Sequence, residues 1–291
     1  MRPFYARPAY AAAFGYGAED VGPWETAVIL RPVPGAGAMD AIGCYPLASL
    51  AAGADIAGGL EHLRQAGLVS VVLVADPLTA PGPDRLCSGF EVCRPFKAHY
   101  LVDPDHPAHV AATHRRWIRK AQQACRISQV ALAEAMEDWL RLYAGLVRRH
   151  EVTGAPDFPT SYFDALAGLP DLRVLAASCG DRIVAMSLWA LSDDVAYYHL
   201  GASDDAGYDA RAMYGLIAAG IDAFGGGRVV HLGGSAGLAD DAEDGLARFK
   251  RGFSNRAVTA YLCGARLDPD RYASLSAGRP ATPFFPAYRQ P

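Results

Sequence analysis

The chain has 291 residues, of which 51% are hydrophobic and 20% charged, and its formal net charge at pH 7 is −4. This length suggests two domains or one large one, and the composition is that of an ordinary folded protein, which excludes wholesale disorder. The small negative charge provides no overall attraction to nucleic acid, so any such contact needs a local basic patch.

Six cysteines are scattered along the chain without a CxxC pair. The closest two, Cys87 and Cys93, are separated by five residues and have no companion histidine or cysteine cluster, so we expect no metal site. The N-terminus lacks the apolar run of a signal peptide, and glycine and proline interrupt every candidate membrane span. These features predict a soluble, cytoplasmic protein with reduced cysteines.

In the first hundred residues, short apolar runs bounded by turn residues predict strands and one helix. Strands are expected at Thr26–Leu30, where Arg31-Pro32 should end the run, and at Leu68–Ala75. A helix is expected over Asp55–Gly67, and a further strand at Phe96–Val102. This part of the chain therefore already alternates between strand and helix.

A helix signal at Asp103-Pro104-Asp105 predicts a helix that runs to about Ala124. Four cations share one face of this helix, opposite an apolar side that includes Trp117: Arg115, Arg116, Arg119 and Lys120. No acid is interleaved with them, so ion pairs within the helix cannot balance their charge. A solvated basic face and a site for an anionic ligand both remain open.

From Leu132 onward the pattern is more regular. An apolar arc predicts a helix over Leu132–His150. A hairpin, a strand, a helix, a strand, a helix and a strand follow at these ranges: Leu172–Ser178 with Ile183–Leu191, Val195–Gly201, Tyr208–Phe224, Arg228–Leu232, Asp244–Gly252 and Ala257–Cys263.

Three segments in this order, YYHLGASD (Tyr197–Asp204), HLGGS (His231–Ser235) and GLARFKRGF (Gly245–Phe253), carry a family resemblance. They resemble the Fem-type, aminoacyl-tRNA-dependent peptidyltransferases and their GNAT-like acyltransferase relatives, over about Pro95 to Cys263. The resemblance implies an α/β fold of tandem GNAT-like halves, each a mixed twisted sheet with flanking helices. It places a degenerate half at 1–125 and a catalytic half at 126–267, with a tail at 268–291 that packs back on the first half.

The resemblance also implies that Phe249 and Lys250 lie at the reacting centre, where the lysine stabilises a developing oxyanion. Attack of an amine on an ester builds negative charge on the carbonyl oxygen, which a fixed ammonium would stabilise. The alternative is that Lys250 lies on a solvated helix surface. The residues expected to bind substrate are Arg115, Arg116, Arg119, Lys120, His199, His231, Ser235, Arg248 and Arg251, of which the two histidines are also candidates for a general base.

The implied activity is transfer of an aminoacyl group from aminoacyl-tRNA to an amine of a small peptide, natural product or peptidoglycan precursor, without metal or cofactor. CoA-dependent relatives bind pyrophosphate where the helix after the third strand begins. Here that segment carries Asp204, Asp205 and Asp209, which disfavours CoA. Acyl-CoA-dependent N-acylation and a catalytically silent binding module remain the alternatives, and the sequence predicts no oligomeric state.

Overall fold

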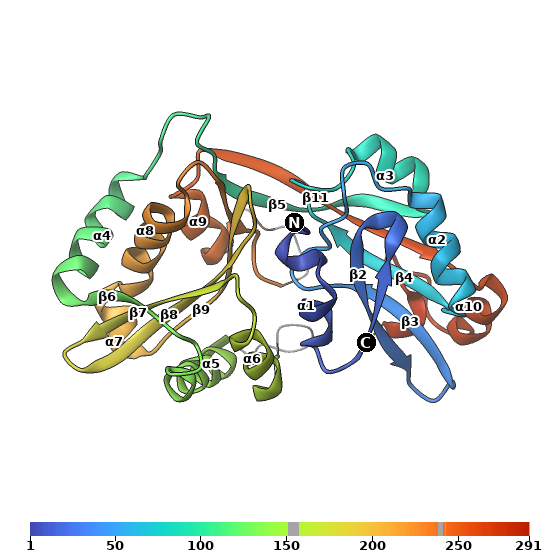
Figure 1. Cartoon of the computed structure of the whole chain (residues 1–291), viewed down its shortest axis with the longest axis horizontal. Coiled ribbons are helices and arrows are strands. Elements are labelled where there is room, and N and C mark those ends of the chain that lie inside the picture. The colour runs from blue at the N-terminus through green and yellow to red at the C-terminus, as the bar shows by residue number, and fades with distance from the viewer. Residues whose placement is uncertain (151–156, 238–240, 242, 291) are drawn as a thin grey trace. The chain divides into compact units, whose positions relative to one another are not determined.

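The computed structural model describes residues 1–150, 157–237, 241 and 243–290. The chain divides into two compact units, one of Ala98–Val258 together with Met1, the other of Arg2–Lys97 and Thr259–Pro291. We call them the central unit and the terminal unit. Each is an α/β body built on its own strands and helices (Figure 1).

The terminal unit has strands in the order β1-β2-β3-β4-β11. Their bounds are β1 Gly17–Val21, β2 Thr26–Val33, β3 Ala38–Gly43, β4 Ser70–Ala75 and β11 Arg256–Arg266. The helices are α1 Pro8–Ala12, α2 Ile56–Gln65, α3 Pro83–Gly89 and α10 Pro269–Ser276, with 3-10 turns at Phe4–Ala6, Gly22–Trp24 and Ala287–Arg289. Its core joins Trp24 to Leu60 and Leu63 of α2 and to Leu73 of β4.

The central unit has strands in the order β5-β10-β9-β8-β7-β6. Their bounds are β5 Val92–Val102, β6 Arg126–Val130, β7 Leu172–Cys179, β8 Arg182–Leu191, β9 Val195–Ser203 and β10 Val229–Gly233. The helices are α4 Ala112–Ala124, α5 Met136–His150, α6 Thr160–Ala167, α7 Asp205–Ala210, α8 Ala212–Phe224 and α9 Gly245–Arg251.

The two units share one pattern of strand pairing. In each, antiparallel strands lead to one parallel pair, β3 with β4 and β9 with β10, and the next strand is antiparallel again. That next strand comes from elsewhere in the chain, because β11 follows the central unit in sequence and β5 precedes it. The predicted α/β fold is confirmed, with a mixed sheet and flanking helices in both units.

Strand β9 presents alternate side chains to two helical layers, as a strand must. Tyr198 contacts Met213 of α8, whereas the next residue, His199, contacts Tyr162 of α6. Figure 1 shows α4, α8 and α9 on one side of these strands and α5 and α6 on the other. Helix α8 packs closely because a Cβ on its Gly220 would lie 2.1 Å from the Trp189 ring of β8.

Several element boundaries differ from the sequence prediction. Pro32 does not end β2, because β1 pairs with β2 only as far as Leu30 and the proline lies beyond it on a free edge. Helix α4 begins at Ala112 rather than near Asp103. The Asp103 carboxylate instead accepts the backbone N–H of Asp105 at 3.0 Å and pairs with Arg256 at 2.7 Å, so it caps a turn.

Other elements were not predicted at all, namely β1, β3, β6, α1, α3, α6 and α10. The helix expected over Tyr208–Phe224 is interrupted at Arg211, whose φ of 60° lies in the left-handed region. Helices α7 and α8 therefore meet at a bend, which brings the Arg211 guanidinium toward α4. The expected helix at Leu132–His150 is present from Met136.

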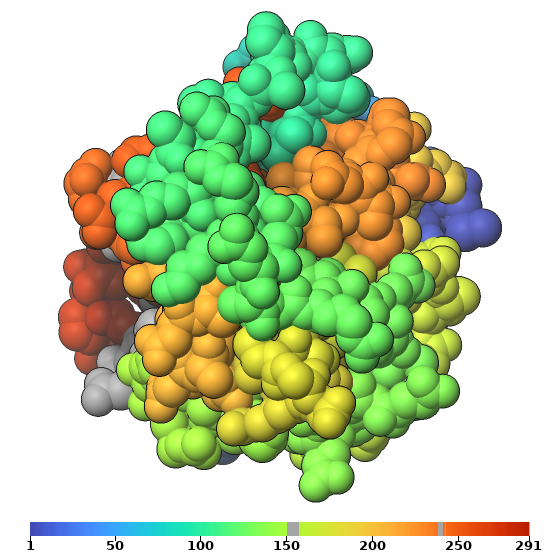
Figure 2. Space-filling view, turned by 90° about the vertical axis from the view of Figure 1, so that its left-hand side faces the viewer, coloured from blue at the N-terminus to red at the C-terminus, as the bar shows by residue number. Residues whose placement is uncertain are grey.

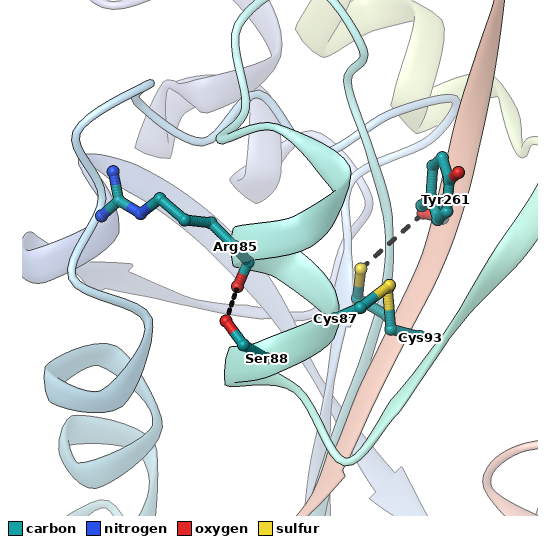
Figure 3. The surroundings of a disulfide bond; sticks show 6 residues. Arg85, Cys87, Ser88, Cys93 and Tyr261 are labelled. Atoms are coloured by element: carbon teal, nitrogen blue, oxygen red, sulfur yellow. Dashed lines mark hydrogen bonds between the residues drawn. A yellow bond between two sulfur atoms is a disulfide. The ribbon is translucent and has the colours of Figure 1, made fainter.

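The expectation of reduced cysteines is wrong at one pair. Cys87 of α3 and Cys93 of β5 form a disulfide, with their Cα atoms 4.9 Å apart (Figure 3). Helix α3 ends at Gly89 and the chain turns directly into β5, which brings the two residues within bonding range. Cys263 of β11 is a buried free thiol in the core cluster against which Cys93 packs, and it contacts the carbonyl oxygen of Tyr261.

Candidate functional site

Helix α9 turns Lys250 inward. The Asp244 carboxylate caps the helix by accepting the N–H groups of Leu246 and Ala247, each at 3.0 Å. At the other end, Lys250 is only 8% exposed, and its Nζ donates to the carbonyl oxygen of Gly234 at 2.7 Å. The alternative of a solvated lysine on the helix surface therefore does not describe this side chain.

The loop after β10 is shaped to receive this ammonium. Pairing of β10 with β5 shifts register between His231 and Gly233, which is a β-bulge that redirects the chain. Gly233 has a φ of 82°, and a Cβ there would lie 3.0 Å from Lys250 Nζ. Glycine thus supplies both the backbone conformation and the space for the lysine.

A buried pair of histidines lies beside this loop. His99 Nδ1 and His231 Nε2 are 3.0 Å apart, and the two side chains are 5% and 1% exposed. Burial, followed by the positive charge of Lys250, lowers the pKa of His231 to about 3. An imidazole with so low a pKa is a weak proton acceptor near pH 7, which weakens its candidacy as a general base. His99 was not predicted because its partner is 132 residues away in sequence.

His199, the second predicted histidine, lies on β9 and forms a 2.9 Å hydrogen bond with the Tyr162 hydroxyl of α6. Burial lowers its pKa to about 3. Its surroundings are those of a neutral residue held in the core between β9 and α6. The structure thus gives His199 a packing contact that the sequence could not show, because α6 was not predicted.

Phe249 is held by an unpredicted residue, His114 of α4. The His114 Nε2–H donates to the Phe249 carbonyl oxygen at 2.9 Å, and the imidazole packs between Tyr214 and Phe253, with centroid distances of 5.0 and 4.7 Å. His114 Nδ1 is buried without a hydrogen-bond partner among the described residues. A Cβ on Gly252 would lie 2.1 Å from this ring, so glycine is needed there.

A second contact joins the same two helices, because the Ala111 N–H donates to the Gly252 carbonyl oxygen at 2.8 Å. The start of α4 is therefore tied to the end of α9. Since α4 carries the predicted cations and α9 carries Lys250, the two candidate parts of the site form one packed body.

The four predicted cations of α4, Arg115, Arg116, Arg119 and Lys120, are all exposed. The sequence predicted that Trp117 lies on the apolar side of this helix, but the side chain is only half-buried and cations surround its ring. The Arg116 and Arg211 guanidinium carbons lie 4.8 and 4.7 Å from the ring centroid, and Lys120 Nζ lies 5.8 Å from it. Figure 2 faces this side of the molecule, with α4 in green across it. We use the name α4 basic patch for Trp117 and the cations around it, namely Arg115, Arg116, Arg119, Lys120 and Arg211.

The remaining predicted residues take different places. Ser235 is 9% exposed and directly follows Gly234, the acceptor of the Lys250 hydrogen bond. Arg248 and Arg251 are exposed on α9. Arg251 lies 3.9 Å from Glu243, and both arginines differ from Lys250 in that the lysine is buried.

The acids after β9 are engaged in the fold. Asp204 caps α7 by accepting the Gly207 N–H at 3.0 Å, and it pairs with Arg141 at 3.1 Å and Arg182 at 2.7 Å. Asp205 pairs with Arg149 of α5. Asp204 is therefore the N-cap of α7, and its carboxylate is bonded to the Gly207 N–H in the first turn of this helix.

Within the described residues, no group of three or more histidine, cysteine, aspartate or glutamate side chains is arranged to hold a metal ion. Among the helices in the described part of the chain, none combines the length and the hydropathy that crossing a membrane requires.

Residues 108–251 match the family model described as acetyltransferase (GNAT) domain. The solved structures that the fold matches include the C-terminal domain (DUF2156) of a proposed lysylphosphatidylglycerol synthetase from Agrobacterium fabrum. It is 13% identical with a TM-score of 0.63, over 92% of this chain and 89% of that one.

The fold also matches FemX, which is 13% identical with a TM-score of 0.60 over 90% of each chain. A conserved protein of unknown function from Bacteroides thetaiotaomicron is 11% identical, with a TM-score of 0.59 over 89% of this chain and 88% of that one. No curated protein sequence matches the chain significantly. At these identities the structural matches establish a shared fold.

Proposed function

We propose which acyl group this chain moves, starting from the match of residues 108–251 to the acetyltransferase (GNAT) domain model. We infer that it transfers an aminoacyl group from aminoacyl-tRNA to an amine of a small peptide, a natural product or a peptidoglycan precursor, and forms an amide bond. The observation that carries this proposal is the buried Lys250 ammonium, held 2.7 Å from the Gly234 carbonyl oxygen on the Gly-rich loop.

The chemistry needs a cation where charge develops. The acceptor amine attacks the ester carbonyl, the carbonyl oxygen becomes an oxyanion, and collapse of this intermediate releases the tRNA 3′ oxygen, which takes up a proton. In this proposal Lys250 stabilises the oxyanion, and its low exposure supports the role because it limits competition from water. With the pKa of His231 and of His199 near 3, the amine proton leaves through substrate or water in this proposal rather than to either imidazole.

Two features favour a tRNA donor over CoA. The Gly207 N–H in the first turn of α7 is already bonded to the Asp204 carboxylate, so this donor is not available to a pyrophosphate. The α4 basic patch, in contrast, is exposed, and its cations and half-buried indole suit phosphates and an unstacked base. FemX shares the fold, and the sequence resembles the Fem-type enzymes, which use aminoacyl-tRNA.

Acyl-CoA is the alternative donor, favoured by the family model itself, which is described as an acetyltransferase domain. The two donors differ in a simple way, because only one is destroyed by ribonuclease. A transfer assay with a mixture of charged tRNAs and a panel of amines, alongside calorimetric titration with CoA and acetyl-CoA, separates them. We expect ribonuclease-sensitive transfer and no tight CoA binding.

The role of Lys250 is tested with Lys250→Ala, for which we expect turnover to fall by about 10²–10³ with donor affinity nearly unchanged. Lys250→Arg should restore activity only in part, because a planar guanidinium cannot occupy the position of a compact ammonium. Leu246→Ala on the exposed side of the same helix is the matched control and should keep full activity. Micromolar CoA binding with ribonuclease-insensitive transfer would replace the tRNA donor by acyl-CoA.

A further inference from the structure

A buried carboxylate in the terminal unit binds two arginines. Asp40 of β3 is 0% exposed, and its Oδ1 lies 3.3 Å from Arg31 Nε of β2 and 3.0 Å from Arg289 Nη2. Its Oδ2 accepts the Tyr288 hydroxyl at 3.0 Å and Arg289 Nε. Both oxygens are therefore fully used, and the C-terminal segment is fixed to the sheet through them.

The charges of this cluster do not balance. Among the residues that the structure describes, two guanidinium groups face one carboxylate, which leaves one positive charge on half-buried side chains: Arg31 is 23% and Arg289 is 18% exposed. Arg31 donates only through Nε within the residues that the structure describes, so both of its Nη groups have no protein partner there. A desolvated, unbalanced cation is costly, and an anion bound to it would remove that cost.

A cavity of about 430 Å³ opens beside these arginines. Ile42 and Val72 of the sheet line one part of it, and Phe284, Phe285 and Pro286 of the C-terminal segment line another. Phe285 is held in place by β11, because a Cβ on Gly264 would lie 2.6 Å from its ring. The volume lies within the range of small-molecule sites, about 300–1,000 Å³.

We propose that this cavity binds a small organic carboxylate with an aromatic or branched apolar body. One excess positive charge matches one carboxylate, and the Arg31 Nη groups offer the paired donors that a carboxylate accepts. The aromatic and aliphatic walls match an apolar body. All the lining residues belong to the terminal unit, so this site is separate from Lys250 and does not depend on the proposed transferase activity.

The test uses the full chain and two probes of equal shape, 3-phenylpropionate and its neutral amide, with binding measured by calorimetry and by saturation-transfer NMR. We expect the acid to bind and the amide to bind at least about tenfold more weakly, because the amide cannot pair with a guanidinium. Arg31→Gln should weaken binding of the acid by about ten- to hundredfold and remove the preference for the acid. Arg64→Gln on exposed α2 is the matched control and should bind as the wild type does.

Arg31→Lys keeps the charge without the paired donors, so it should retain a weakened preference for the acid even if Arg31→Gln folds poorly. Wild-type protein that binds neither probe at millimolar concentration would overturn the proposal. Equal binding of acid and amide, or undiminished acid binding in a folded Arg31→Gln protein, would overturn it as well.

Discussion

Two of the buried histidines of the central unit, His199 and His231, should make the protein sensitive to mild acid. Burial lowers the pKa of His199 and of His231 to about 3, below the ordinary value of 6.5. Below pH 6.5 these two histidines therefore bind protons in the unfolded chain but stay unprotonated in the folded chain. The corresponding stability is present above pH 6.5 and is lost as the pH falls from there toward 3.

The size of this effect follows from proton linkage. Between pH 7.5 and 5.0, an unfolded histidine gains almost one proton and a folded one with a pKa near 3 gains none. Each of the two residues then costs about 2 kcal/mol of unfolding free energy, so the pair costs about 4 kcal/mol. That is a large share of a typical stability of about 5–15 kcal/mol.

Urea unfolding at a series of pH values, followed by the fluorescence of the buried tryptophans, measures this loss directly. In His199→Gln, where the amide can still bond to the Tyr162 hydroxyl, the loss between pH 7.5 and 5.0 should be smaller by about 2 kcal/mol. His109→Gln, at an exposed position, is the control and should lose as much as the wild type. If His199→Gln loses as much stability in acid as the wild type, His199 is not a buried neutral histidine.

Two further predictions concern the contacts that position Lys250 and the surface beside it. Gly252→Ala should cost about 1–3 kcal/mol of unfolding free energy and most of the activity, because its Cβ would lie 2.1 Å from the His114 ring. The control is Gly245→Ala at the start of α9, where a Cβ meets open space, and it should be nearly neutral. Urea unfolding measures both variants. Replacement of Arg116 and Lys120 by glutamine should lower the slope of log affinity for tRNA against log salt by roughly 1–2, and an unchanged slope in filter-binding titrations would show that the patch is only a solvated surface.

Local sequence patterns were sufficient for many elements of the central unit. The hairpin β7–β8, strand β9 and helices α5 and α8 follow from alternation, apolar arcs and caps, which depend on residues close in sequence. The helix around Lys250 follows from a local pattern as well, because its capping aspartate and the lysine lie within seven residues, whereas the lysine itself was singled out by the family resemblance. The roles predicted for Lys250 and for the cations of α4, and the domain boundaries, stay predictions.

The contacts that shape both candidate sites depend on residues far apart in sequence. His99 meets His231 across 132 positions, and Arg289 meets Asp40 across 249. No periodicity within either segment encodes such a partner, because the first pair depends on β5 lying beside β10 in the sheet and the second on where the C-terminal 3-10 turn packs. Strand β5 pairs with β10, and β11 pairs with β4, although the two strands of each pair are far apart in sequence. Such pairings depend on many weak contacts across the whole unit.

The sequence by itself therefore determined the α/β class, many of the elements of the central unit and the helix that carries Lys250. Only the tertiary structure decided which way the side chains on those elements point. It placed Trp117 among cations because Arg211 bends the chain toward α4, and it buried Lys250 because a β-bulge and Gly233 leave space for it. The physical reason is that periodicity specifies a face of a helix or strand, whereas burial and partners depend on what packs against that face.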